Sequence, residues 1–442
     1  MKKAIKRNVK KMLALTLIAT MLLPTVGCFQ QKPEAIAFPE YEDDREVLIG
    51  GWDAPKNTLE DIQIAKDMGL THMFLDQYHA KRGTPEYEAA LRLYEQVGLN
   101  VIVQSPNSIT AEVIINDNTN YAEFPAVTHI NYWDEPEYGN IPRVAEYADE
   151  YLAKYGDSDI LFYVNLLPNT STKRFDGHTF AEYVKHYADT VLTKLPEDAR
   201  WLSCDIYPME KTGDGSELRP KWLSGIETLA LQGKESHAKV HFFLQATEHY
   251  NYRAVQEEDI RWQFYVNMAF GVQGFSYFTY ADSILTDFEH SCVGRNETGK
   301  IHDTYYMAQT VNNEIKKFDH VYLNYEWQGT LPLIGTNNEK GTNANFSGLT
   351  ASLETLDVAT RWESAEDALI GVFKDAQGND GLIVTNFTDP ADGLDNLVRF
   401  EFNDVRAARV YRGGVAHDYE VVNNRLDVEL DPGEGVFIIL VH

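Results

Sequence analysis

The sequence predicts an α/β protein, a (β/α)8 barrel of the TIM type followed by a C-terminal all-β sandwich. From about residue 46 to residue 320, short apolar runs alternate eight times with amphipathic segments of helical period, which is typical of a parallel sheet covered by helices. After residue 321 the helical period ends, and short strands are separated by turns rich in Gly, Asn and Asp, which is typical of a sandwich. A doubly wound sheet is the alternative for residues 46–320, but eight units without a phosphate-binding loop favour the barrel.

The eight barrel strands are expected where apolar runs end in polar residues. They are residues 47–52, 71–78, 100–105, 126–135, 159–168, 200–208, 239–247 and 272–280. Helices are expected between or after these strands, at residues 57–69, 85–98, 140–155, 178–194, 219–235, 257–271 and 303–318. The first helix has a polar cap at its start and Gly69 at its end, as helices commonly do.

The second domain, residues 321–442, is expected to consist of strands without helices. Six strands are indicated, at residues 368–375, 380–388, 397–403, 407–414, 425–431 and 435–442. Short strands with turn residues between them predict two packed antiparallel sheets.

The N-terminal residues are not expected to belong to the fold. Residues 1–27 combine a basic start, the apolar run MLALTLIATMLL and a small residue before Cys28. This is typical of a secretory signal peptide, and the run is shorter than the ~20 apolar residues that span a membrane. The Gly27-Cys28 junction resembles a bacterial lipobox, with Thr25 where Leu is usual, and this implies a lipid on Cys28; ordinary cleavage nearby is the alternative. Residues 28–45 then form a polar tether, and the protein is expected outside the cytoplasm on a lipid anchor.

The composition argues against several classes of partner. The formal net charge is −28, and removal of the basic signal makes it more negative, so a nucleic-acid partner is not expected. The three cysteines, Cys28, Cys204 and Cys292, do not indicate a disulfide framework. The sequence has no CxxC, HExxH, EF-hand, GxGxxG or P-loop motif, so neither a metal nor a cofactor is expected. No feature indicates an oligomeric state.

Polar and aromatic residues stand at the ends of the predicted barrel strands. The active sites of such barrels lie at the C-terminal ends of the strands, so these side chains are expected to meet at one mouth. The expected substrate contacts are Trp52, Asp53, Asp76, Gln104, Trp133, Asp134, Asn165, Tyr207, Gln245 and Tyr277. Aromatic faces stack on sugar rings, while carboxylates and amides bind pairs of hydroxyl groups. The mouth therefore predicts a neutral carbohydrate as substrate.

Cleavage of a glycosidic bond needs two carboxyl groups, one that protonates the leaving oxygen and one that acts as nucleophile or as base. Glu135, which follows Trp133 and Asp134 at the end of the fourth predicted strand, is the expected general acid. Asp134 is expected to orient neighbouring groups. The alternative for this acidic pair is a helix cap or a solvated loop.

The sequence WDEP at residues 133–136 resembles the Asn-Glu-Pro signature of the large clan of retaining (β/α)8 glycoside hydrolases, with Asp134 where Asn is usual. Residues 46–442 are similar to secreted bacterial proteins related to the β-galactosidase-like members of that clan. VNLLP (164–168), DIYP (205–208) and residues 260–280 resemble stretches of poorly characterised relatives. The resemblance implies a glycosidase that uses no cofactor. It also implies a nucleophilic Glu at the end of the seventh strand, where this sequence has Gln245.

Three interpretations of the second carboxyl group remain open. It is Glu248, just after Gln245, or Asp205 at the end of the sixth strand, or no second carboxylate is competent. In the third case the protein is a glycan-binding surface lipoprotein on a degenerate barrel. A structural or transport-associated lipoprotein is a further alternative. A carboxyl separation of about 5–5.5 Å would imply retention of configuration, and about 6.5–9.5 Å inversion.

Overall fold

The structure is a computed structural model that describes residues 36–42, 45–76, 79–104, 114, 117–213, 215–283, 288–294, 298–338, 341 and 343–442. The predicted signal peptide and Cys28 lie outside the described residues. The described residues within Phe38–His442 form one compact unit. No helix among the described residues is long and apolar enough to cross a membrane.

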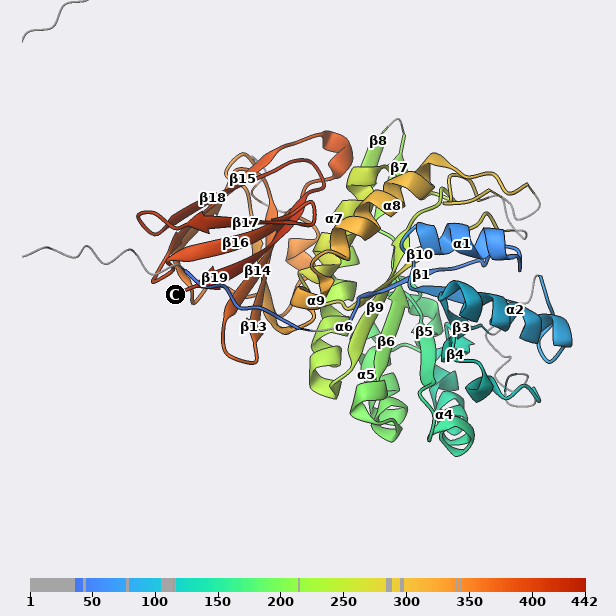
Figure 1. Cartoon of the computed structure of the whole chain (residues 1–442). Helices are drawn as coiled ribbons and strands as arrows, with labels where there is room; N and C mark the ends of the chain where they lie inside the picture. The colour runs from blue at the N-terminus through green and yellow to red at the C-terminus, as the bar shows by residue number, and fades with distance from the viewer. Residues whose placement is uncertain are drawn as a thin grey trace, which may run out of the picture. The chain divides into compact units, whose positions relative to one another are not determined.

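Eight parallel strands close into a barrel, as the sequence predicts (Figure 1). In chain order they are β1 (Leu48–Gly51), β2 (His72–Leu75), β3 (Asn100–Val103), β4 (Val127–Asp134), β5 (Leu161–Leu166), β6 (Trp201–Asp205), β9 (Lys239–Gln245) and β10 (Gly274–Phe278). The barrel closes because β10 pairs with β1, with Gly274 opposite Leu48. The antiparallel hairpin β7 (Met209–Thr212) and β8 (Gly215–Leu218) is inserted after β6 and was not predicted.

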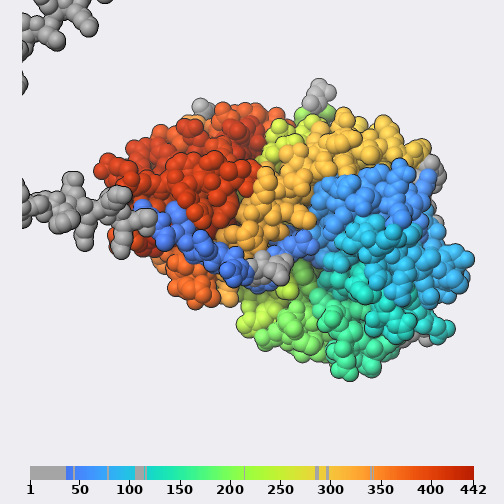
Figure 2. All heavy atoms as spheres, in the orientation of Figure 1, coloured from blue at the N-terminus to red at the C-terminus, as the bar shows by residue number. Residues whose placement is uncertain are grey.

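Helices surround the barrel. They are α1 (Leu59–Asp67), α2 (Pro85–Val97), α4 (Ile141–Tyr155), α5 (Phe180–Thr190), α6 (Trp222–Ser236), α7 (Glu257–Met268), α8 (Asp303–Ile315) and the short α9 (Asp319–Tyr322). Side chains fix where several begin: the Thr58 hydroxyl accepts from the Asp61 amide at 3.1 Å, and Thr179 forms a capping box with Glu182. The blue surface of α1 adjoins the yellow surface of α8 (Figure 2), where the Tyr305 hydroxyl donates to the Ile64 carbonyl at 2.9 Å.

The C-terminal region is an antiparallel sandwich, again as predicted. A six-stranded sheet has the order β11-β13-β14-β19-β16-β17, and a three-stranded sheet has the order β12-β15-β18. The strands are β11 (Tyr325–Leu333), β12 (Ala359–Ser364), β13 (Ala368–Asp375), β14 (Asp380–Asn386), β15 (Asn396–Phe402), β16 (Ala407–Arg412), β17 (Val415–Glu420), β18 (Arg425–Leu430) and β19 (Gly435–Val441). The sequence did not indicate β11, β12 or β17. β17 is an edge strand whose side chains are all exposed, so it lacks the apolar alternation that marks a strand.

Partly buried polar contacts join the barrel to the sandwich. Arg253, in the loop between β9 and α7, donates to Asp259 of α7 at 2.8 Å and to Asp389 of the sandwich at 3.0 Å. The sandwich therefore helps to hold the loop that follows the seventh barrel strand.

Candidate active site

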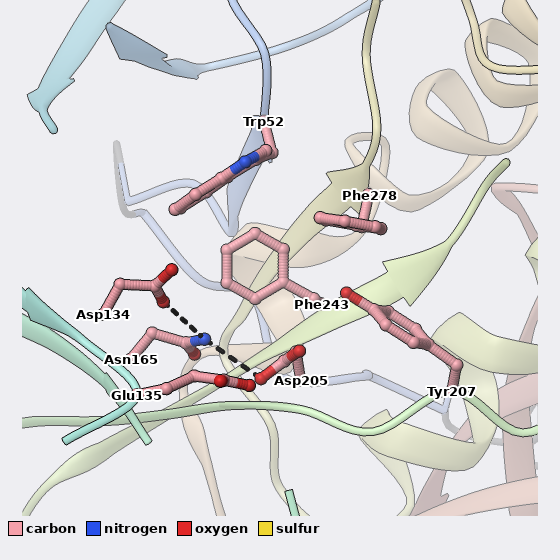
Figure 3. Close-up of a pocket in the computed structure, with 8 residues that line it drawn as sticks. All are labelled: Trp52, Asp134, Glu135, Asn165, Asp205, Tyr207, Phe243 and Phe278. Atoms are coloured by element: carbon pink, nitrogen blue, oxygen red, sulfur yellow. Dashed lines mark hydrogen bonds between the residues drawn. The ribbon is translucent and has the colours of Figure 1, made fainter. Parts of the chain in front are cut away.

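A pocket of about 200 Å³ lies at the C-terminal ends of the barrel strands (Figure 3). β1, β4, β5, β6, β9 and β10 contribute to it, each through residues within two positions of its C-terminal end. Eight residues line it: Trp52, Asp134, Glu135, Asn165, Asp205, Tyr207, Phe243 and Phe278. Six of them were expected from the sequence, and Phe243 and Phe278 were not.

A β-bulge in β4 determines which side chains of the WDEP sequence face the pocket. Trp133 stands opposite Val164 and Asn131 opposite Tyr163, so one extra residue, Tyr132, is inserted between them. The bulge changes the alternation along the strand, and Asp134 then lines the pocket. Trp133 is 5% exposed and packs against Tyr147 of α4, with ring centroids 5.9 Å apart. Its placement in the helix-facing core does not fit the substrate contact expected from the sequence.

Glu135 occupies a sharp turn directly after β4. Its φ is +56°, in the left-handed region, which costs a side-chain-bearing residue about 1–2 kcal/mol. Arg174 of the β5–α5 loop binds it twice: Nη1 donates to the carboxylate at 2.8 Å and Nη2 to the backbone carbonyl at 3.0 Å. Arg174 also donates to Glu137 at 3.1 Å. These contacts hold the Glu135 carboxylate beside Asp205 (Figure 3).

Asn165 links the two aspartates of the pocket. Its Nδ2 donates to Asp134 at 3.3 Å and to Asp205 at 3.1 Å. Its Oδ1 accepts from the Ser203 hydroxyl at 2.9 Å, which fixes the orientation of the amide. Ser203 in turn lies 2.9 Å from Nδ1 of His241. A buried hydrogen-bonded network inside the barrel thus positions the acidic groups at its mouth.

The carboxyl groups of the pocket differ in their surroundings. Burial, together with the charges of Glu135 and Asp134, raises the pKa of Asp205 well above its usual range. Burial and the charge of Glu135 raise the pKa of Asp134 to about 7. The Glu135 side chain is 31% exposed and forms an ion pair with Arg174. Asp205 and Asp134 therefore hold their protons more readily than exposed aspartates do, and both lie close to the ion pair of Glu135 and Arg174.

Aromatic rings form the other side of the pocket. Trp52 and Phe243 lie with centroids 5.5 Å apart, and Tyr207 stacks on Phe278 at 5.3 Å. The Tyr207 hydroxyl is buried and has no hydrogen-bond partner in the described part of the chain. An unpartnered buried hydroxyl at a pocket wall is available to a hydroxyl group of a ligand.

Tyr277 was expected at the mouth, but its neighbour Phe278 takes that place. The Tyr277 hydroxyl donates to Asn312 of α8 at 2.6 Å, so this side chain faces the helices outside the barrel. Adjacent residues of a strand face opposite sides, and Ser276, which bonds His241 inside the barrel at 2.8 Å, shares the inward side with Phe278. The signal that could have predicted Phe278 at the mouth is the period-two alternation of the strand, which places Phe278 on the same side as Ser276.

Gln245, at the end of the seventh barrel strand, connects two backbone segments by hydrogen bonds and does not line the pocket. Its Oε1 accepts from the Met209 amide at 3.1 Å, and its Nε2 donates to the carbonyls of Met209 at 3.2 Å and Arg253 at 2.8 Å. All three contacts are to backbone, so the amide is fully engaged. The expected contact between Gln245 and substrate does not fit this arrangement.

Glu248 also lies outside the pocket lining. Its carboxylate forms an ion pair with Lys211, and His290 Nε2 lies 3.3 Å from it. Glu248, Glu289 and His290 bring their ligand-type atoms within 4.8 Å of one another, and Lys211 already supplies a positive charge there. Of the carboxyl groups expected from the sequence, Asp205 is therefore the one placed with Glu135.

Asp53, Asp76 and Gln104 are buried at the ends of β1, β2 and β3 but do not line the pocket. The Ala54 amide donates to Asp76 at 3.3 Å. Burial, and to a smaller extent the negative charge of Asp76, raises the pKa of Asp53 to about 8. The backbone carbonyl of Gln104 accepts a hydrogen bond from Arg82 at 3.1 Å. These residues form a second cluster of buried polar side chains, which does not share the hydrogen bonds made by Asn165.

No family model and no curated protein matches the sequence. Among solved structures, the chain is similar to a candidate α-galactosidase from Bacteroides fragilis, with 10% identity over 90% of this chain and 79% of that chain and a TM-score of 0.50. It is also similar to a β-galactosidase from Marinomonas ef1, with 11% identity over 68% of this chain and 61% of that chain and a TM-score of 0.43. A β-glucuronidase from Ruminococcus gnavus gives 13% identity, 60% and 49% coverage and a TM-score of 0.42.

The chain thus spans less than two thirds of the Marinomonas and Ruminococcus chains. At these identities the likeness concerns the fold. In fold, the chain is a closed (β/α)8 barrel followed by an antiparallel sandwich, and it is similar to the solved structure from Bacteroides fragilis.

Proposed function

We propose that this protein is a glycoside hydrolase that cleaves a neutral oligo- or polysaccharide, with Asp205 and Glu135 as its carboxyl pair. The observation that carries the proposal is the meeting of these two groups in one pocket, in different electrostatic surroundings, opposite a wall of aromatic rings. Enzymes commonly separate the roles of two carboxyl groups by such differences in environment. The proposal favours Asp205 over Glu248 as the partner of Glu135.

Asp205 is the proton donor in this mechanism, and Glu135 is the nucleophile or the base. A general acid must hold its proton at the working pH, and burial beside two acidic groups gives Asp205 that property. Glu135, positioned by its ion pair with Arg174, would attack the anomeric carbon or activate water. This assignment reverses the roles that the sequence alone indicated, in which Glu135 was the acid.

The rest of the pocket binds and orients one sugar ring. Trp52, Phe243 and Phe278 offer apolar faces for the ring, and the Tyr207 hydroxyl and the Asn165 amide offer polar contacts. The volume of about 200 Å³ lies below the ~300–1,000 Å³ of sites for drug-sized ligands. A pocket of this size suits the removal of single sugar units from a chain end.

The test is hydrolysis of a panel of aryl glycosides and glycans by the wild type and by Glu135→Gln. Turnover should fall by about 10²-fold or more in the variant. Glu137→Gln is the matched control, because Glu137 binds the same Arg174 but does not line the pocket. It should stay within about threefold of the wild type. Equal losses in both variants would point to Arg174 alone and would contradict a chemical role for Glu135.

A second candidate function is glycan binding without cleavage, and Gln245 is the observation that favours it. This residue stands where the resemblance places a nucleophilic Glu, and it is committed to backbone contacts. A wild type that binds a sugar of the panel but hydrolyses none would support this alternative.

We also propose that Cys28 carries a lipid that anchors the protein to the outside of a cell membrane. The basic and apolar segments before Gly27-Cys28 support it. Expression of the full chain in a bacterium with labelled palmitate tests it. Label and membrane association should be lost in Cys28→Ala, and a soluble, unlabelled wild type would refute the anchor.

A further inference from the structure

An exposed tyrosine stands in the loop between β9 and α7. Tyr250 is 80% exposed, the largest exposed fraction among the large hydrophobic side chains of the described residues. Its φ is +49°, in the left-handed region that favours Gly or Asn over an aromatic residue. Neither its exposure nor its backbone conformation stabilises the fold, and strained residues of this kind often belong to functional sites.

The loop that carries Tyr250 is fixed on both sides. The Tyr252 amide donates to the His249 carbonyl at 2.9 Å, which closes a tight turn around Tyr250. Glu248 exchanges backbone hydrogen bonds of 2.7 and 3.1 Å with Glu289, and the Lys211 amide donates to the Asn251 carbonyl at 2.8 Å. The loop backbone that carries the tyrosine is therefore held in a defined place, which lowers the entropic cost of binding through it.

His249 connects this tyrosine to the wall of the pocket. The His249 ring lies 5.6 Å from Tyr207 and 5.4 Å from Phe278, which both line the pocket. The Tyr250 ring lies 5.5 Å from the same imidazole. Tyr252 adds a further ring, 4.8 Å from His249. Ring contacts thus connect the pocket wall to Tyr250 through His249, which is itself 5% exposed.

Asp205 indicates which part of a substrate would reach Tyr250. A proton donor lies on the side of the departing oxygen, and Tyr207, two residues after Asp205, contacts His249. The departing group would therefore leave the pocket toward His249 and Tyr250. The pocket has room for about one ring, so a second sugar unit must lie outside it.

We propose that Tyr250 is a stacking platform for the departing sugar unit, and that the substrate is accordingly an oligosaccharide with at least one sugar beyond the cleaved bond. This inference rests on the proposed hydrolase function. The exposed ring offers a flat apolar face of the kind on which sugars stack.

The test compares two substrates of the same sugar that differ only in the departing group. The full chain is assayed with the α- and β-fluorides of glucose, galactose and mannose and with the corresponding disaccharides, because fluoride is too small to reach Tyr250. In Tyr250→Ala, the ratio of kcat/KM for the disaccharide to that for the fluoride should fall about three- to tenfold, the scale of one aromatic contact. Tyr250→Phe, which keeps the ring, should retain the ratio.

Tyr306→Ala is the matched control, since Tyr306 is 54% exposed on α8, and it should leave the ratio unchanged. An unchanged ratio in Tyr250→Ala would overturn the platform. If the wild type hydrolyses nothing, the hydrolase proposal fails. The platform is then tested by binding, with the wild type and Tyr250→Ala titrated with the same disaccharides and their monosaccharides. A preference for the disaccharide that Tyr250→Ala abolishes would support it, and no preference in the wild type would refute it.

Discussion

The two sides of the pocket carry different kinds of side chain, although both are formed by the C-terminal ends of barrel strands. One side, formed by the ends of β4, β5 and β6, carries Asp134, Glu135, Asn165 and Asp205, and the other, formed by β1, β9 and β10, carries Trp52, Phe243 and Phe278. The acidic side is held by hydrogen bonds and an ion pair, and the aromatic side by ring packing. We infer that bond cleavage belongs to the acidic side and sugar binding to the aromatic side, so variants of the two sides should affect different kinetic constants.

Asp205→Asn should have the largest effect. If Asp205 is the acid, the variant should lose about 10³–10⁴-fold in kcat on a disaccharide, whose departing oxygen needs a proton. On a 2,4-dinitrophenyl glycoside, whose departing group needs none, the loss should be about tenfold or less. Steady-state kinetics on both substrates measures this difference. Equal losses on the two substrates would make Asp205 the nucleophile and restore Glu135 as the acid.

The substitution Gln245→Glu would place a carboxyl group at the end of β9, one of the strands that form the aromatic side. A Glu side chain there would lack the N–H group that now donates to the carbonyls of Met209 and Arg253 and would bury an unpaired charge. The free energy of unfolding should fall by about 3 kcal/mol, measured by urea denaturation. Gln377→Glu, in an exposed turn of the sandwich, should change it by less than about 0.5 kcal/mol. A stable Gln245→Glu variant with raised turnover would contradict the division between the two sides.

The Asp134 carboxyl of the acidic side should make the free energy of unfolding depend on pH. Burial raises the pKa of Asp134 in the folded protein to about 7, against about 3.9 in an unfolded chain. Between these values the folded state keeps a proton that the unfolded state has lost, so stability should decrease as the pH rises from about 4 to 7. Asp134→Asn, which cannot ionise, should be more stable than the wild type by about 1–3 kcal/mol at pH 8, and this gain should disappear at pH 4.

Urea denaturation at pH 4 and pH 8 measures the effect, with Asp157→Asn as an exposed control that should show no such difference. The same gain from Asp134→Asn at both pH values would contradict an electrostatic origin.

The strand order of the barrel and the residues at several strand ends could be predicted from local sequence, because both follow from alternation of apolar runs and helical segments. Glu135, Asn165 and Asp205, which line the pocket, were expected at strand ends in this way. The side of a strand that a residue faces depends on register, and a single inserted residue in β4 was enough to turn Trp133 away from the pocket. Local sequence does not reveal such a bulge.

Contacts between distant residues could not be predicted either. Arg174 lies 39 residues after Glu135, in a loop whose path is set by tertiary packing. Gln245 looked like a ligand because it ends a barrel strand, yet its partners Met209 and Arg253 belong to a hairpin that was not predicted and to a loop. The site was therefore predictable where it depends on strand ends and not where it depends on the loops between them.

Phe278→Ala should have the smallest effect and tests the aromatic side directly. Loss of the ring that stacks on Tyr207 removes apolar surface from the pocket wall without touching a carboxyl group. We expect KM to rise about three- to tenfold while kcat changes less than about threefold, the pattern of lost binding that is equal in the ground and transition states. Phe278→Tyr, which keeps the ring, should retain KM. A fall in kcat as large as that of Asp205→Asn would mean that the aromatic side takes part in bond cleavage, and the division of labour between the two sides would then be wrong.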